Sequence, residues 1–352
     1  MNLVYKALGH RLFWPLAMLV VLLAVNVIAV PGFLSITVNS EGHLFGSLID
    51  IVRNGAPTLI IAVGMTLVIA TRGIDLSVGS MCAIAGALAC SIILASPTPN
   101  DVGTVTVAVL LSLALALVLG VWNGFLVAVL GIQPIIATLI LMTAGRGIAM
   151  LITEGQILTV NSAPFKFIGS GFLAGIPVAT IVAAVVLALV ALLTRRTALG
   201  MLIESVGINP EASRQAGVRA RGLLFTVYAL SAVLAAVAGL ILTSNQTAAD
   251  SNNTGWLIEL DAILAVVLGG TSLNGGRYSL TGTLVGALVI QTLITTVYTV
   301  GIPPIATMVF KAAVVVAVTL LQSSRVSSAL ARRRSRGRRA ETVGSAAEVV
   351  AR

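Results

Sequence analysis

Residues able to do chemistry are sparse in this sequence, and the clearest group interrupts an apolar region. The stretch Thr71 to Ser80 reads TRGIDLSVGS and places Arg72 and Asp75 between two long apolar runs. A carboxylate or hydroxyl at such a point can accept hydrogen bonds from the free N–H groups of a helix that begins near Val78. We therefore predict that Asp75 or Ser77 caps this helix and that Arg72 pairs with Asp75.

Other polar side chains stand within or beside apolar runs. Trp122 and Asn123, in GVWNGFL, can present a ring and an amide to a neutral polar ligand, although packing and a helix-to-helix hydrogen bond explain the same pair. Arg146 is expected to snorkel or to form a buried pair rather than to contact a ligand. The candidates for a ligand path or gate are Asp75, Ser77, Trp122, Asn123, Gln133 and Asn274.

No catalytic or metal-binding constellation accompanies these groups. The chain has two histidines, and it lacks an HExxH motif, a cysteine pair with metal-ligand spacing and a Gly-x-Ser-x-Gly elbow. Cys82 and Cys90 lie in one apolar run, where cysteine behaves as a small hydrophobic residue. No lysine follows a glycine, so the sequence also lacks a P-loop. We expect a non-catalytic chain without a cofactor or metal of its own.

The composition predicts a polytopic membrane protein. Hydrophobic residues make up 58% of the 352 residues and charged residues 9%, against about 25% charged residues in ordinary soluble domains. A soluble chain of this composition lacks the polar side chains to cover its core. Cys82 and Cys90 give no disulfide framework, and the first apolar run is predicted to be a retained signal anchor.

Apolar runs of about 17 to 25 residues can cross a bilayer as helices. An all-α fold of about ten crossings is expected, with the eighth short enough to be a broken helix. Gly282 and Gly286 in the ninth run have the GxxxG spacing that permits close helix packing, within the chain or between subunits. The candidate crossings lie near 13–31, 54–71, 77–95, 103–130, 133–152, 175–194, 222–243, 259–271, 278–299 and 303–322.

Basic residues mark the cytoplasmic side under the positive-inside rule. They gather near the N-terminus, between 195 and 221, and in 325–352, which holds eight Arg and two Glu. Six predicted crossings separate the first two groups and four separate the last two, so all three groups share one side. We expect cytoplasmic termini, a membrane domain over 1–324 and a disordered basic tail over 325–352 that faces lipid rather than nucleic acid.

The one large polar insertion on the predicted inner side reads RRTALGMLIESVGINPEASRQAGVRARG. Asn209 and Pro210 supply a cap and a first helical position, and Gly217 can end the helix that follows. A short helix on the cytoplasmic face is suited to docking of a soluble partner, whereas a solvated connector would not need these start and stop signals. Docking is the preferred interpretation.

Four motifs in a fixed order resemble the inner-membrane permease subunits of bacterial ABC importers for monosaccharides, of the ribose, xylose and galactofuranose type. The motifs are GMTLVIATRGIDLSVGS, NGFLVAVLGIQPIIATL, VGINPEASRQAGV and ELDAILAVVLGGTSLNGGR. The resemblance extends from about residue 50 to 322 and is greatest to galactofuranose permeases. It implies a second permease subunit, identical or homologous, a periplasmic sugar-binding protein, and an ABC ATPase that binds ATP and Mg²⁺.

The resemblance also implies a coupling helix at which the ATPase docks. The matching positions are Gly207, Asn209, Glu211, Ala212 and Gly217. The long Arg-rich tail departs from the shorter tails of the family. The predicted function is part of the translocation path for a neutral monosaccharide in the bacterial inner membrane. A secondary carrier for a small polar metabolite is the alternative, and it is disfavoured because no carboxylate falls in the middle of a predicted crossing.

Overall fold

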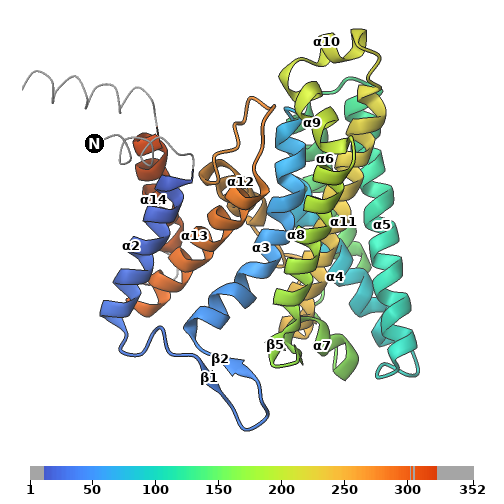
Figure 1. The fold of residues 1–352 in the computed structure, drawn as a ribbon. Helices are drawn as coiled ribbons and strands as arrows, with labels where there is room; N and C mark the ends of the chain where they lie inside the picture. Colours follow the sequence, from blue (N-terminus) through green and yellow to red (C-terminus); the bar gives the residue numbers. More distant parts are fainter. Residues whose placement is uncertain (1–11, 302, 304–305, 323–352) are drawn as a thin grey trace, which may run out of the picture.

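A computed structural model describes residues 12–301, 303 and 306–322 (Figure 1). The predicted tail over 325–352 lies outside the described residues, as do Lys6 and Arg11. The described chain is mostly helical. Its helices are α2 (Phe13–Ala29), α3 (Ser47–Ala70), α4 (Val78–Ala95), α5 (Val102–Ala128), α6 (Pro134–Ile152), α7 (Ala163–Ser170), α8 (Val178–Arg196), α9 (Leu199–Ile208), α10 (Pro210–Gln215), α11 (Ala220–Gln246), α12 (Ile258–Leu268), α13 (Leu280–Thr299) and α14 (Thr307–Gln322).

Short antiparallel strand pairs join some of the loops. The pairs are β1 (Thr37–Val38) with β2 (Leu44–Phe45), β3 (Leu158–Thr159) with β6 (Ala248–Ala249), and β4 (Phe172–Leu173) with β5 (Ile176–Pro177). The β3–β6 pair joins the loop after α6 to the loop after α11. These two loops therefore lie at the same end of the helix bundle, as the predicted topology requires.

Seven of the described helices are long and apolar enough to cross a membrane, namely α3, α4, α5, α6, α8, α11 and α13. The other three helices at predicted crossings are shorter, with 17 residues in α2, 16 in α14 and 11 in α12. At 1.5 Å per residue, α12 spans roughly 16 Å, about half of a bilayer core. The structure confirms a multi-span helical protein, with a half-length helix at the eighth run.

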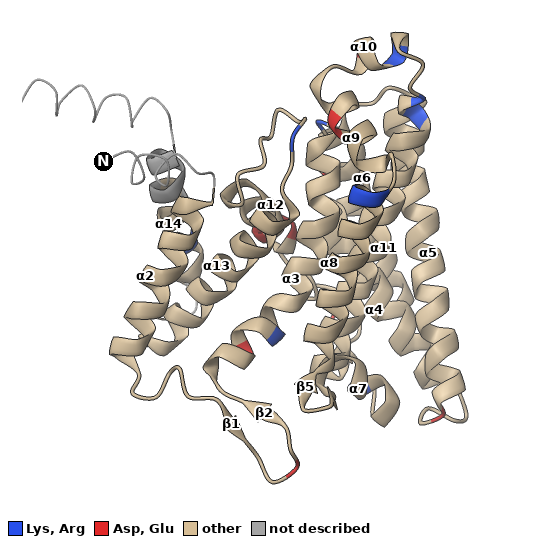
Figure 2. Ribbon diagram, viewed as in Figure 1, with Lys and Arg blue, Asp and Glu red and all other residues tan. Residues whose placement is uncertain are grey.

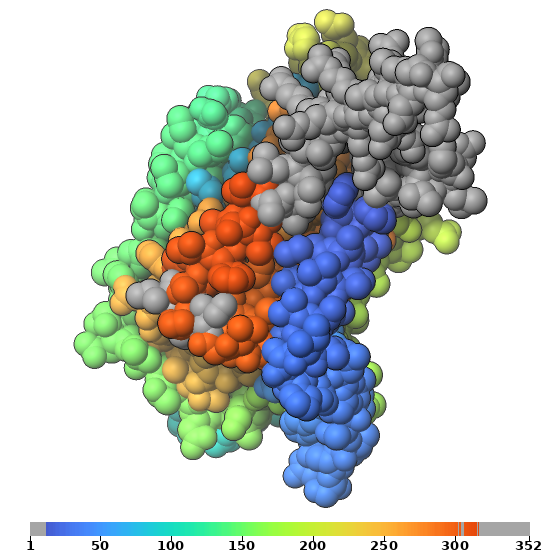
Figure 3. Space-filling model, turned by 90° about the vertical axis from the view of Figure 1, so that its left-hand side faces the viewer, coloured from blue at the N-terminus to red at the C-terminus, as the bar shows by residue number. Residues whose placement is uncertain are grey.

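The helix α3 lies between two groups of helices (Figure 1). On one side, α2, α13 and α14 pack together, and Figure 3 shows α2 beside the orange and red helices on one face of the molecule. On the other side, α11 packs against α3, α4 and α5. Most of the buried core belongs to α3, α4, α11 and α13, whereas α5, α6 and α8 expose much of their apolar surface, as lipid-facing helices do.

Glycines allow the closest helix contacts. A Cβ on Gly239 of α11 would collide with the backbone of Cys82 in α4, so these two helices cross at glycine distance. Likewise, a Cβ on Gly282 would meet Gly269, and one on Gly286 would meet Ala265. The GxxxG pair of α13 therefore packs against α12 within the chain.

Many of the charged residues lie towards the ends of the bundle, and others lie on α3 and at α12 (Figure 2). The helix α10 and the first turn of α2 lie towards the same end of the molecule (Figure 1). This agrees with the even number of crossings predicted between them. The hairpin of β1 and β2 and the helix α7 lie towards the opposite end.

Candidate functional site

Asp75 lies inside the bundle, in the non-helical segment between α3 and α4, and is only 1% exposed. One carboxylate oxygen accepts hydrogen bonds from Ser77 Oγ at 2.6 Å and Ser77 N at 3.1 Å. The other accepts from Ser231 Oγ at 2.8 Å. Because Ser231 belongs to the interior of α11, Asp75 lies within the bundle and not at one of its ends. Three donors offset the desolvation of the carboxylate.

Asn123 of α5 extends this network, since its Nδ2 donates to Ser77 Oγ at 2.9 Å. The Oδ1 atom of Asn123 and the hydroxyl of Tyr228 are buried without a hydrogen-bond partner in the described part of the chain. The structure thus brings Asp75, Ser77 and Asn123 together. Their contacts hold the start of α4 against α5 and α11, which is the helix-to-helix role expected for Asn123.

The helix α4 begins at Val78, where the sequence predicts it, but its cap differs from the prediction. Ser77 occupies the cap position without a side-chain capping bond, because its hydroxyl turns back to Asp75. Asp75 accepts one N–H, that of Ser77, before the helix begins. The predicted cap is therefore only partly formed, and the hydroxyl serves the buried carboxylate instead.

The predicted pair between Arg72 and Asp75 is wrong. The guanidinium of Arg72 donates instead to three backbone carbonyls. Its Nε donates to Gly207 O at 2.6 Å and to Asn274 O at 3.1 Å, and its Nη2 donates to Ile208 O at 2.5 Å. The carbonyl oxygens at the end of α9 have no partner within the helix, so a cation is favourable there. Arg72 also has a φ of 66°, a conformation that non-glycine residues rarely adopt.

The remaining path candidates lie apart from Asp75. Trp122 is 50% exposed and stacks on Phe125 with ring centroids 5.9 Å apart. Gln133 is exposed and precedes α6 without a side-chain capping bond. Asn274 is exposed, and its carbonyl accepts from Arg72. Their contacts give no support to a common site.

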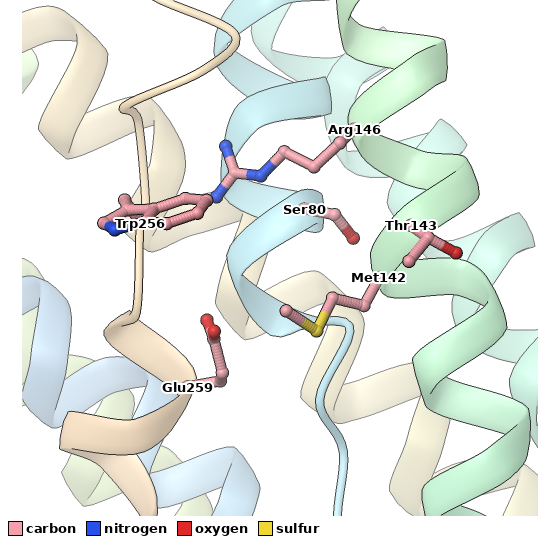
Figure 4. A pocket seen from close by; sticks show the side chains of 6 residues that line it. All are labelled: Ser80, Met142, Thr143, Arg146, Trp256 and Glu259. Carbon is pink, nitrogen blue, oxygen red and sulfur yellow. The ribbon is translucent and has the colours of Figure 1, made fainter.

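A cavity of about 310 Å³ opens next to the first turns of α4 and α12, and we call it the Trp256 cavity (Figure 4). Arg146 lines it from α6, and its Nη1 donates to the carbonyls of Ser251 at 3.0 Å and Thr254 at 2.6 Å. Among the ion pairs of the described residues, none involves Arg146, so the buried pair expected for it is not formed there. The lining residues are Ser80, Met142, Thr143, Arg146, Trp256 and Glu259.

The Trp256 cavity forms where two interrupted segments meet. Glu259 stands in the first turn of α12, and Leu257 before it has a φ of 58°. A Cβ on Gly79, in the first turn of α4, would collide with the carboxylate of Glu259 and the carbonyl of Gly255. The sequence did not identify this cavity, because its residues come from three helices. The available signal was the short eighth run, which begins three residues after Trp256.

The α9–α10 segment carries the start and stop signals that the sequence predicts. The Asn209 side chain accepts from Glu211 N and Ala212 N, each at 3.1 Å, and Pro210 is the first residue of α10. Gly217 follows the helix with a φ of 85°. Glu211 and Arg214 form an exposed ion pair at 2.6 Å, and the hydrogen bond from Arg214 lowers the pKa of the Glu211 carboxyl group.

Gly207 has a packing role at the end of α9. A Cβ at this position would collide with Ala70 O, at the end of α3, and with Gly276 N. Gly276 N itself donates to Ala70 O at 2.9 Å. The end of α9, the end of α3 and the loop before α13 are therefore in direct contact.

Comparison with known proteins gives these features a context. A family described as "Branched-chain amino acid transport system / permease component" matches residues 47–319. The chain belongs to this permease family. It is 47% identical over 332 residues to the galactofuranose transporter permease protein YtfT of Escherichia coli (strain K12), covering 93% of this chain and 95% of that one. No solved structure matches the permease.

Two further relatives are import permeases for other sugars. The permease is 44% identical over 330 residues to the fructose import permease protein FruF of Bifidobacterium longum (strain NCC 2705), covering 92% of this chain and 91% of that one. It is 36% identical over 312 residues to the ribose import permease protein RbsC of Escherichia coli (strain K12), covering 87% of this chain and 92% of that one. The predicted kinship with ABC sugar-importer permeases is confirmed, in preference to the secondary carrier.

Proposed function

We propose that this permease forms part of the translocation path for a neutral monosaccharide, which a periplasmic binding protein delivers and ATP hydrolysis in a separate ATPase drives. The relatives are named for galactofuranose, fructose and ribose. These sugars share an uncharged polyhydroxylated ring and differ in ring size and stereochemistry. A galactofuranose-like or pentose-like sugar is the expected cargo.

The proposed topology has ten crossings. The helices α2 and α14 complete theirs with flanking residues, and α12 crosses together with the non-helical segment before it, because irregular backbone is tolerated where it faces protein or a water-filled cavity. Both termini lie in the cytoplasm, and a second permease subunit completes the path. Residues 1–324 form the membrane domain, and the basic tail contacts lipid.

Contact between α9 and the interrupted α3–α4 segment is the observation that carries the coupling proposal. The helix α10 is capped, exposed and at one end of the bundle (Figure 1), which suits it to dock against an ATPase. Directly before it, Gly207 touches Ala70 and accepts from Arg72. A movement of α10 is thus transmitted to the segment that contains Asp75 and Ser77. The proposed coupling residues are Gly207, Asn209, Glu211, Ala212 and Gly217.

Reconstitution of the permease with its ATPase and binding protein in lipid vesicles tests this function. Wild-type vesicles should accumulate a pentose or hexose only with ATP and the binding protein, and a binding screen of sugars on the binding protein identifies the cargo. Glu211→Gln and Gly217→Val should reduce sugar uptake at least tenfold while ATP hydrolysis continues. Uptake without ATP would instead indicate a secondary carrier.

The chain offers a matched control for each substitution. Gly155 has a φ of 72°, and a Cβ there, as at Gly217, would meet nothing within 4 Å. Glu154 is exposed like Glu211. Both lie in the loop after α6, at the opposite end of the bundle. Glu154→Gln and Gly155→Val should therefore leave coupling unchanged. An equal loss of sugar uptake in these controls and in the α10 variants would contradict the assignment of α10.

A further inference from the structure

We propose that the Trp256 cavity is a binding site for one monosaccharide ring within the permease, formed by the ring of Trp256, the guanidinium of Arg146 and the carboxylate of Glu259. This inference rests on the proposed sugar transport and adds to it the residues that hold the sugar on its way. The cavity has a volume of about 310 Å³, which lies at the lower end of the roughly 300–1,000 Å³ of small-molecule sites and suits a single sugar ring.

Trp256 supplies an apolar surface at the mouth of the cavity. Trp256 is 60% exposed and lines the cavity together with Arg146 and Glu259. In Figure 4 its ring lies beside the guanidinium of Arg146 and above the carboxylate of Glu259. The flat ring can pack against the C–H face of a sugar, while its indole N–H remains a donor. Among the described residues, no packing contact accounts for this large exposed aromatic side chain at a cavity that also holds two charged groups.

Glu259 is a buried acceptor that the protein does not satisfy. The residue is 3% exposed, and its carboxylate lines the cavity. Within the described residues, its carboxylate accepts a hydrogen bond only from its own backbone N–H and takes part in no ion pair. Buried polar atoms are usually hydrogen-bonded. The lone pairs that remain on the two carboxylate oxygens can accept bonds from two neighbouring sugar hydroxyls.

Arg146 is the complementary donor. Its Nη1 is held by Ser251 O and Thr254 O, which fixes the guanidinium in place. None of the hydrogen bonds found in the described residues involves its Nε or Nη2, so these donors remain for a ligand. Sugar hydroxyls both donate and accept, so they can bond Arg146 and Glu259 together. The two formal charges cancel, which favours an uncharged ligand over an anion or a cation.

The place of the cavity in the fold suits a transported ligand. The first turns of α4 and α12 meet there, and the segments before them, 71–77 and 250–257, are non-helical. Such interruptions inside a membrane protein lie where the backbone faces a cavity, and transporters bind substrates between discontinuous helices. A change in the relative position of α4 and α12 would therefore open or close the cavity.

Protection from chemical labelling tests occupancy directly. Thr143 lines the cavity and is exposed, whereas the native Cys82 and Cys90 are buried. A Thr143→Cys variant of the permease–ATPase complex in nanodiscs, without binding protein, should react with a maleimide. Millimolar D-ribose or D-fructose should slow this reaction at least threefold. An unchanged rate with every sugar would overturn the proposal, and so would protection by leucine alone, which would indicate an amino-acid site.

Transport by variants in the complete reconstituted importer provides the second test. Trp256→Leu and Glu259→Gln should lower sugar uptake at least tenfold with ATP hydrolysis within twofold of wild type, and Trp256→Phe should restore most of the uptake. Trp14→Leu, in α2, is the matched control. Normal uptake by Trp256→Leu would contradict the site while leaving the proposed function intact, whereas a wild-type importer that carries no sugar would contradict both.

Discussion

Arg72 and Gly207 are joined by a hydrogen bond of 2.6 Å from Nε of Arg72 to the carbonyl oxygen of Gly207. This contact links the second residue after α3 to the last turn of α9, with α10 beginning three residues after Gly207. The same guanidinium reaches Ile208 O and Asn274 O. One side chain thus joins the end of α9, directly before α10, to the segment that leads to Asp75.

We predict that Arg72→Lys uncouples the transporter. A lysine ammonium is a point donor and cannot reproduce the planar fork that reaches three carbonyls. Sugar uptake should fall about tenfold, the equivalent of roughly 1.4 kcal/mol, while ATP hydrolysis by the reconstituted complex persists. Arg277, which is exposed and close in sequence to Asn274, provides the control Arg277→Lys. Equal effects of both substitutions would show that a general sensitivity to replacing arginine by lysine in this region, not the carbonyl contacts, is responsible.

The orientation can be measured with single cysteines and an impermeant thiol reagent on intact cells. Asn100 and Asn252 are exposed in loops expected outside, and cysteines there should react. A cysteine on α10 should react only after permeabilisation. Gln215 is the suitable position, because Ser213 is 7% exposed and would resist labelling on either side. Labelling of Gln215→Cys in intact cells would reverse the proposed topology.

Weakening the hydrogen bonds that the Asp75 carboxylate accepts should destabilise the junction between α3 and α4 without changing which sugar is transported. Ser231→Ala leaves one carboxylate oxygen of Asp75 without its partner, and Asp75→Asn replaces an acceptor with a donor. Each should lower the free energy of unfolding by about 1–2 kcal/mol, seen as a lower melting temperature of the purified permease. A changed sugar preference at unchanged melting temperature would instead place Asp75 in contact with the substrate.

The ion pair between Asp261 and Lys311 should be essential for docking α14 against α12. The Nζ–Oδ2 distance is 2.7 Å, and the side chains are 17% and 19% exposed, respectively. Lys311→Met leaves a poorly solvated carboxylate, and losses of about 3–5 kcal/mol are typical when a buried pair is broken. The double variant Asp261→Leu/Lys311→Met should recover much of the melting temperature. Failure to recover would mean that packing, not charge, holds α14.

Local signals account for the parts of the fold that the sequence predicts well. Val78 begins α4 where the polar residues Asp75 and Ser77 interrupt the apolar runs, and Asn209, Pro210 and Gly217 bound α10, because such turn and cap signals act within a few residues of the helix end. Apolar runs locate the helices because hydropathy is likewise a local property of the sequence. The kinship with sugar-importer permeases likewise follows from motifs read along the chain.

The partners of the polar side chains could not be predicted in the same way. Arg72 bonds Gly207, 135 residues away, and not Asp75, its neighbour in sequence. Asp75 is served by Ser231, and the Trp256 cavity draws on α4, α6 and α12. The amino-acid sequence by itself determined the membrane-spanning character, the start of α4 and the short exposed helix α10, because hydropathy and turn signals are local. Only the tertiary structure decided which buried charge meets which donor, because packing brings together residues that are distant along the chain.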